Sequence, residues 1–185
     1  MGELCFNTGM TGYQEVFTDP SYTGQVLIMN NVHIGNYGTK LTDVESSYVK
    51  IKGLICKNLE EIYSRAQADD NLLSYLNKNN IVAIDGVDTR ALVIHVRTKG
   101  AMNCIISSEI FDVTELQKLL NTCPDMNGQE LASTVSTKEV YTLGDESAKH
   151  KVAVLDFGIK KNILNCLIER GVYVKVFPAK TTAAE

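Results

Sequence analysis

The chain has 185 residues, of which 44% are hydrophobic and 22% are charged, and its formal net charge at pH 7 is −4. This length suits one ordinary domain, or a domain plus part of another, in a soluble globular protein. The negative charge argues against a nucleic-acid partner, which requires clustered lysine and arginine. No apolar run approaches the ~20 residues of a membrane helix, and no signal peptide is visible, so we expect a cytoplasmic protein without membrane association.

A strand is predicted over residues 3–8. It runs into the densest series of turn and hydrogen-bonding residues in the sequence, FNTGMTGYQEVFTDPSY at residues 6–22. The short side-chain oxygens of this stretch can bond nearby amides, Pro20 fixes one backbone dihedral, and aromatic side chains can anchor a loop. From these residues alone, the stretch is interpreted as a well-packed connection between two strands.

Further elements follow in chain order. A continuous apolar run at residues 25–30 predicts a buried strand, and residues 48–56 predict a second strand with one partly exposed end. Asp69 or Asp70 is expected to cap a helix over residues 72–76, after which residues 81–84 form a short buried strand.

The next segment predicts two more helices with a strand between them. Asp88 or Thr89 caps a helix at residues 90–99, which Gly100 closes. A strand follows at residues 103–106. Asp112 or Thr114 then starts a helix that Pro124 ends.

The sequence changes from polar to strongly apolar near residue 150. A polar linker is predicted at residues 141–150, between a domain at 1–140 and a piece of a second domain at 151–185. That piece is interpreted as an apolar strand, a helix and a second strand, the opening of a parallel α/β fold. A parallel sheet needs cover on both faces, so we expect the chain to be cut inside this second domain.

Several sequence blocks carry a family resemblance. These blocks are FNTGMTGYQE and TDPSY, HIGNYG at 33–38, IDGVDTR at 84–90 and VAVLDFGIKKNIL at 152–164. In this order, they resemble the small, glutamine-hydrolysing subunit of carbamoyl-phosphate synthetase. The resemblance implies an α/β fold class, with a swivelling β/β/α-type N-terminal domain followed by a truncated flavodoxin-like parallel unit, the start of the amidotransferase domain.

The resemblance also implies a function. Glutamine is hydrolysed to glutamate and ammonia through a cysteine thioester, and the large subunit uses the ammonia, bicarbonate and two ATP to make carbamoyl phosphate for arginine and pyrimidine synthesis. It implies a heterodimer with the large subunit, L-glutamine as substrate and no cofactor in this chain. Ser21 of TDPSY is implied to contact glutamine. From the residues alone, the favoured interpretation is a serine that caps or closes the turn after Pro20.

No catalytic residue is predicted in the chain. An amidotransferase of this class needs a low-pKa cysteine, a histidine base and a carboxylate that orients the histidine. None of the cysteines lies on a glycine-flanked strand-to-helix turn, and no histidine pairs with a cysteine by spacing. We interpret Cys5, Cys56, Cys104, Cys123 and Cys166 as small, reduced core residues and predict neither a metal site nor activity of the chain alone.

Two other functions are open from the sequence. The absence of a recognisable triad supports a non-catalytic interaction or scaffold module. A small self-standing enzyme using His33 or Cys104 is the other alternative. Asp88-Thr89-Arg90 fits an ion pair at a subunit contact, and a helix cap followed by an exposed arginine explains it equally well. Asp156-Phe157-Gly158 is interpreted as a strand end and turn.

Overall fold

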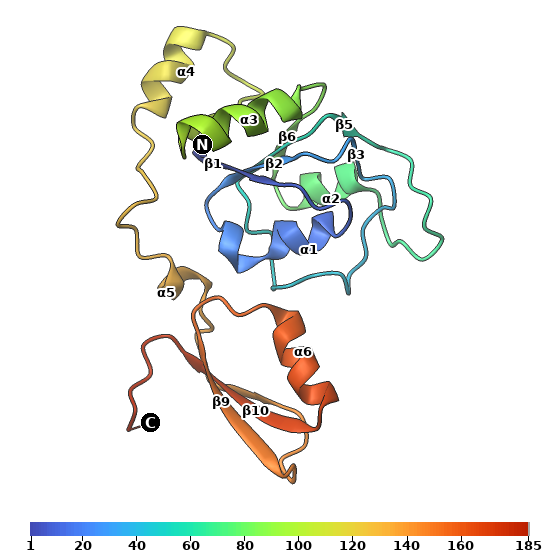
Figure 1. Ribbon diagram of the computed structural model, residues 1–185, viewed down its shortest axis with the longest axis vertical. Coiled ribbons are helices and arrows are strands. Elements are labelled where there is room, and N and C mark those ends of the chain that lie inside the picture. The colour runs from blue at the N-terminus through green and yellow to red at the C-terminus, as the bar shows by residue number, and fades with distance from the viewer. Residues whose placement is uncertain (185) are drawn as a thin grey trace. The chain divides into compact units, whose positions relative to one another are not determined.

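The computed structural model describes residues 1–184 and contains two compact units (Figure 1). The first is Met1–Gly128, and the second begins at Gln129. Each unit is built around a sheet of its own. The domain boundary that the sequence predicts at residue 140 falls inside the second unit.

A five-stranded sheet forms the centre of the first unit. Its order is β6-β4-β2-β1-β7, with β1 (Gly2–Asn7), β2 (Val26–Met29), β4 (Gly53–Ile55), β6 (Val82–Ile84) and β7 (Asn103–Cys104). Neighbouring strands pair in parallel, except that β7 is antiparallel to β1. The strand predicted from the apolar run is β2, and all four of its residues are buried. The predicted α/β fold class is therefore confirmed.

Helices cover both faces of this sheet (Figure 1). On one face lie α1 (Tyr13–Thr18) and α2 (Leu72–Lys78), and on the other lies α3 (Thr89–Lys99). Because side chains alternate along a strand, Leu27 and Met29 of β2 join the core under α1 and α2, whereas Val26 and Ile28 join the core under α3. Burial on both faces explains why β2 reads as a continuous apolar run.

Three helices of the first unit begin at side-chain caps. The carboxylates of Asp88 and Asp112 accept hydrogen bonds from the backbone N–H groups of Ala91 at 3.0 Å and Glu115 at 2.8 Å, at the starts of α3 and α4 (Val113–Leu120). These two caps are among the predicted alternatives. At α2 the predicted cap is wrong, because Asn71 accepts the N–H of Ser74 at 2.8 Å.

The structure departs from the predicted pattern in two places. The strand predicted at residues 48–56 is reduced to β4, because the backbone of Lys50 bonds to Phe17 in α1 and to Gly24 in the turn before β2. The stretch predicted as a simple connection contains α1 and the 3-10 helix η1 (Pro20–Tyr22). A separate two-stranded sheet pairs β3 (His33–Ile34) in parallel with β5 (Asn58–Leu59).

The second unit holds a three-stranded sheet of order β8-β10-β9. Its elements are α5 (Ala132–Val135), β8 (Tyr141–Leu143), β9 (His150–Asp156), α6 (Lys161–Glu169) and β10 (Val172–Pro178). The predicted strand–helix–strand is β9-α6-β10, with β9 and β10 parallel along seven paired residues. The predicted linker at 141–150 contains β8, which pairs antiparallel with β10.

The core of the second unit lies on one face of its sheet. Leu164 of α6 packs on Val174 and Val176 of β10, all of them buried. The apolar strand β9 is more exposed than its sequence suggests, since Val152 keeps 38% and Leu155 keeps 49% of its surface accessible. The exposure follows from the place of β9 at the end of the strand order, where β10 is its one neighbouring strand within the described residues.

Candidate functional site

Ser21 lies in a short, capped turn at the end of the motif-rich stretch. The buried Asp19 precedes η1, and its carboxylate oxygen Oδ1 accepts the backbone N–H of Ser21 at 2.9 Å. Pro20 is the first residue of η1, a position that needs no N–H donor. The Ser21 side chain is exposed, and its hydroxyl makes no hydrogen bond within residues 1–184. The turn therefore presents a hydroxyl that is free to bind a ligand.

The backbone on both sides of this turn is bound to the segment before β4. The Lys50 N–H donates to the Phe17 carbonyl at 2.8 Å, and the Lys50 carbonyl accepts the Gly24 N–H at 3.3 Å. Thr18 is buried, and its hydroxyl accepts the N–H of Glu45 at 2.8 Å. These bonds fix the turn against the body of the first unit, which is the support that a precise binding residue needs.

The start of α1 has an unusual cap. Its N-cap residue is Gly12, which has no side chain, and the Tyr37 hydroxyl oxygen instead accepts the N–H groups of Gly12 at 2.7 Å and Tyr13 at 3.1 Å. The Tyr13 and Tyr37 rings stack with centroids 4.2 Å apart, and the Tyr13 hydroxyl donates to the Gly38 carbonyl. Tyr37 of the HIGNYG block thus caps α1, which lies in the FNTGMTGYQE block.

A second link joins α1 to the same loop. The Gln14 amide donates from Nε2 to the Lys40 carbonyl and accepts the Lys40 N–H at Oε1, each at 2.8 Å. Gln14 is buried, so this reciprocal pair satisfies the polar atoms of its side chain on both sides. Residues 12–18 are held by the loop at residues 37–50, and the loop in turn determines where Ser21 lies.

Three of the cysteines in the first unit have thiols that are poorly suited to act as nucleophiles. Burial raises the pKa of Cys5 and Cys56 to about 12 and that of Cys104 to about 11. A thiol of this kind is almost entirely protonated at neutral pH, whereas a nucleophilic cysteine needs a depressed pKa. Of the predicted core cysteines, Cys56 is fully buried, and the other four are partly buried. Cys166 lies within α6, as predicted.

Within residues 1–184, no hydrogen bond joins Ser21 to any of the three histidines. His33 bonds from Nδ1 to the Glu60 carboxylate at 2.6 Å, an exposed pair that the parallel pairing of β3 and β5 brings together. Sequence reasoning missed this pair, because 27 residues separate its members. His95 is exposed on α3, and His150 begins β9. Within residues 1–184, no group of three or more His, Cys, Asp or Glu side chains is arranged to hold a metal ion.

In the second unit, the end of β9 is organised by a buried carboxylate. Asp156 accepts the N–H groups of Gly158 at 2.9 Å and Ile159 at 2.8 Å through Oδ1, and that of Thr137 at 2.7 Å through Oδ2. The interpretation of Asp156-Phe157-Gly158 as a strand end and turn is confirmed.

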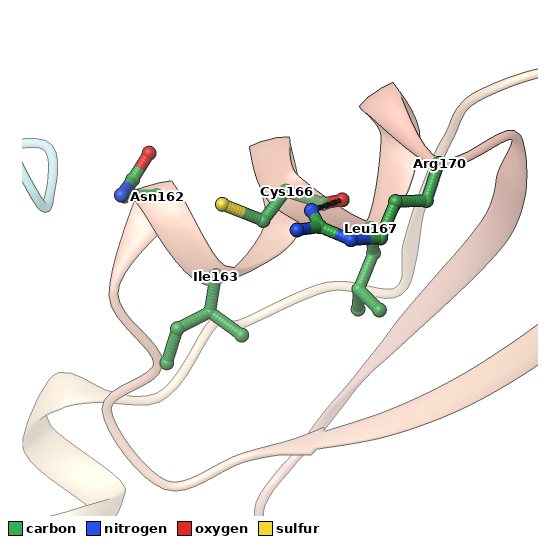
Figure 2. A pocket seen from close by; sticks show the side chains of 5 residues that line it. All are labelled: Asn162, Ile163, Cys166, Leu167 and Arg170. Carbon is green, nitrogen blue, oxygen red and sulfur yellow. Dashed lines mark hydrogen bonds between the residues drawn. The ribbon is translucent and has the colours of Figure 1, made fainter.

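A shallow hollow of about 290 Å³ lies on α6 and the residue after it, lined by Asn162, Ile163, Cys166, Leu167 and Arg170 (Figure 2). Arg170 donates from Nη1 to the Cys166 carbonyl at 2.7 Å. The hollow contains no residue that the sequence proposed for a site. No helix in the described part of the chain is both long and apolar enough to cross a bilayer.

Comparisons with known proteins place these features in a family context. A sequence profile described as "Carbamoyl-phosphate synthase small chain, CPSase domain" matches residues 1–106. Proteins named carbamoyl phosphate synthase small chain are similar over almost the whole chain. The protein from Aquifex aeolicus (strain VF5) is 44% identical over 189 residues, covering 96% of this chain and 51% of the relative.

Two further relatives with the same name give a similar result. The protein from Chlorobaculum tepidum is 42% identical over 184 residues, covering 100% of this chain and 50% of the relative. That from Yersinia pestis is 42% identical over 201 residues, covering 100% and 51%. The chain thus spans about half the length of the curated relatives it matches.

Proposed function

Because this chain belongs to the carbamoyl-phosphate synthase small chain family, we propose that it supplies the first half of the glutamine-hydrolysing subunit of that synthase. Its first unit binds the large subunit, and its second unit opens the amidotransferase domain. The complete small chain hydrolyses L-glutamine, and the ammonia serves carbamoyl phosphate synthesis in the arginine and pyrimidine pathways. The cysteines of the described residues are free thiols, which supports a reducing, cytoplasmic location.

The observation that carries this proposal is the Ser21 turn. The block TDPSY forms a capped turn here, and the exposed Ser21 hydroxyl makes no hydrogen bond within residues 1–184. A hydroxyl can donate to the α-carboxylate or accept from the α-ammonium of glutamine. It can bind and orient a substrate, and within residues 1–184 it forms no hydrogen bond to a carboxylate or imidazole that could activate it as a nucleophile. Ser21 is therefore proposed as a glutamine-binding residue and not as a catalytic one.

The alternative is a non-catalytic interaction module. The high thiol pKa values of Cys5, Cys56 and Cys104 favour inactivity of this chain by itself. We therefore expect no glutamate release from the isolated chain, and we expect it to bind the large subunit. Glutamate release by the isolated chain would contradict the prediction that it contains no catalytic residue.

The role of Ser21 is tested in the complete small chain paired with the large subunit. Ser21→Ala removes the exposed hydroxyl and leaves the bond between the Ser21 N–H and Asp19. We expect the KM for glutamine to rise about tenfold, as for the loss of one hydrogen bond to a charged group. Carbamoyl phosphate synthesis from added ammonia should be unchanged, because it needs no glutamine site.

Thr23→Val is the matched control for this substitution. The Thr23 hydroxyl donates to the Pro20 carbonyl at 2.7 Å, so it serves the turn and not a ligand. This variant should lower the free energy of unfolding with a smaller effect on the KM for glutamine. An unchanged KM in Ser21→Ala would remove Ser21 from the glutamine site.

A further inference from the structure

One stripe of α3 carries side chains that the core does not use. Arg90, Ile94 and Arg97 are all exposed, and their spacing of four and three residues places them on the same side of the helix. Ile94 has 56% of its surface accessible. The side of α3 that faces the sheet is formed by Val96 with Leu92 and Val93. The stripe Arg90–Ile94–Arg97 therefore points away from the sheet that α3 covers in Figure 1.

The stability of the helix does not explain Arg90. It lies in the first turn of α3, where the partial positive charge of the helix N-terminus disfavours a cation, and no acidic residue lies in that turn. The neighbouring Asp88 carboxylate accepts the Ala91 N–H as the helix cap and forms no ion pair with Arg90. An exposed isoleucine at position 94 likewise adds little to folding. Arg97 lies in the last turn of α3, where the helix dipole favours a cation, so Arg90 and Ile94 are the members of the stripe that folding does not explain.

The charges of the stripe have no partners within the unit. Neither Arg90 nor Arg97 makes a hydrogen bond or ion pair within residues 1–184, although acidic residues outnumber basic ones in the first unit. A guanidinium offers donors in a planar fork that matches a carboxylate, and arginine is enriched in protein interfaces. Two unpaired arginines around an exposed apolar side chain have the composition of an interface anchor.

We propose that the stripe Arg90–Ile94–Arg97 is an interaction surface for an acidic protein partner, in which carboxylates flank an apolar depression that receives Ile94. Under the function proposed above, that partner surface lies on the large subunit, and this identification depends on that function. A protein fits better than a nucleic acid, because the acidic first unit would repel a phosphate backbone that tracks along it.

The test measures binding of the complete small chain to the purified large subunit by titration calorimetry at low and high salt. We expect Arg90→Glu and Arg97→Glu each to weaken binding at least tenfold, and Ile94→Asp to weaken it by a similar factor. The loss in the arginine variants should shrink at high salt, where charge interactions are screened. Lys99→Glu makes the same charge change about 180° around the helix from Arg90, since successive residues are about 100° apart, and it should alter the Kd less than twofold.

A thermal melt separates binding from folding. Arg90→Glu places an acidic side chain in the first turn of α3, where the helix dipole favours it. Its melting temperature should therefore equal or exceed that of the parent while its binding weakens. A purely structural role of Arg90 predicts the opposite, a lower melting temperature with binding reduced only in proportion to unfolding.

The outcomes distinguish the two proposals. If the parent chain does not bind the large subunit, the proposed function fails. If the parent binds and the Arg90, Ile94 and Arg97 variants bind equally well, the function stands and the interaction surface is wrong. A third outcome is that fluorescein-labelled duplex RNA binds the parent, and that both arginine variants lose RNA binding but keep large-subunit binding. That result would overturn the protein partner in favour of a nucleic acid.

Discussion

The cap that Tyr37 provides for α1 leads to a sharp prediction. Tyr37→Phe keeps the stacked ring but removes the oxygen that accepts the N–H groups of Gly12 and Tyr13. Each such bond contributes about 0.5–1.5 kcal/mol net, so both together are worth about 1–3 kcal/mol. Gly12 offers no side chain to replace the lost acceptor. We expect the free energy of unfolding to fall by about 2 kcal/mol in urea titrations, within that range.

Hydrogen exchange locates the effect. At about 1.4 kcal/mol per tenfold change, a local loss of about 2 kcal/mol speeds exchange of the Gly12 and Tyr13 amides about 30-fold. Tyr13→Phe is the control, because it removes the bond to the Gly38 carbonyl from the same ring pair but leaves both amides bonded to Tyr37. The reasoning is refuted if Tyr37→Phe lowers the free energy of unfolding by less than about 0.3 kcal/mol and leaves both amides as protected as in the parent.

Three more predictions follow from local geometry. Gly38→Ala should destabilise the chain by more than about 1 kcal/mol beyond Gly86→Ala, because both glycines have positive φ but only at Gly38 would a Cβ lie 2.7 Å from the Ala68 Cβ and 2.9 Å from the Asp70 carbonyl; equal melting temperatures of the two variants would contradict this. The Lys78 ammonium and the Ser74 hydroxyl lower the pKa of Asp70, so the ionised carboxylate stabilises the fold above the unfolded pKa of 3.8, and this effect is lost as the pH falls through the lower folded pKa. The difference in melting temperature between the parent and Asp70→Asn should therefore narrow between about pH 5 and pH 2.5. A difference that stays constant over this range would contradict the prediction. The Cys56 thiol, buried and with a pKa raised to about 12, should be the slowest to react with iodoacetamide at pH 8 and should react readily only in urea, as peptide mapping can check.

Local sequence patterns were sufficient to predict the elements whose causes are local. The cap and closing glycine of α3 are encoded at Asp88 and Gly100, and the apolar run of β2 reflects burial by helices on both of its faces. The strand–helix–strand order of the second unit was also visible. The extent of burial was not, because β9 has the composition of an internal strand but borders only β10 within the described residues.

The parts that the sequence could not predict depend on distant partners. Helix α1 has six residues and a glycine cap, so no local signal distinguishes it from a loop. Its supports are the Tyr37 hydroxyl and the Lys40 backbone, more than 20 residues away. For the same reason, Ser21 was identified through a family resemblance and not through a local pattern. Only the structure shows how its turn is held, with Asp19 capping it and Lys50 bonded to the backbone on both sides.

The position of β9 has a consequence for handling the protein. One side of this seven-residue strand offers unpaired backbone N–H and C=O groups, within the described part of the chain, beside the accessible side chains of Val152 and Leu155. Such an edge is a template for strands from other molecules. Purified as it stands, the chain should form oligomers as its concentration rises. A charge placed at Val152 should keep the chain monodisperse in light scattering, which would show that its solubility depends on this one strand.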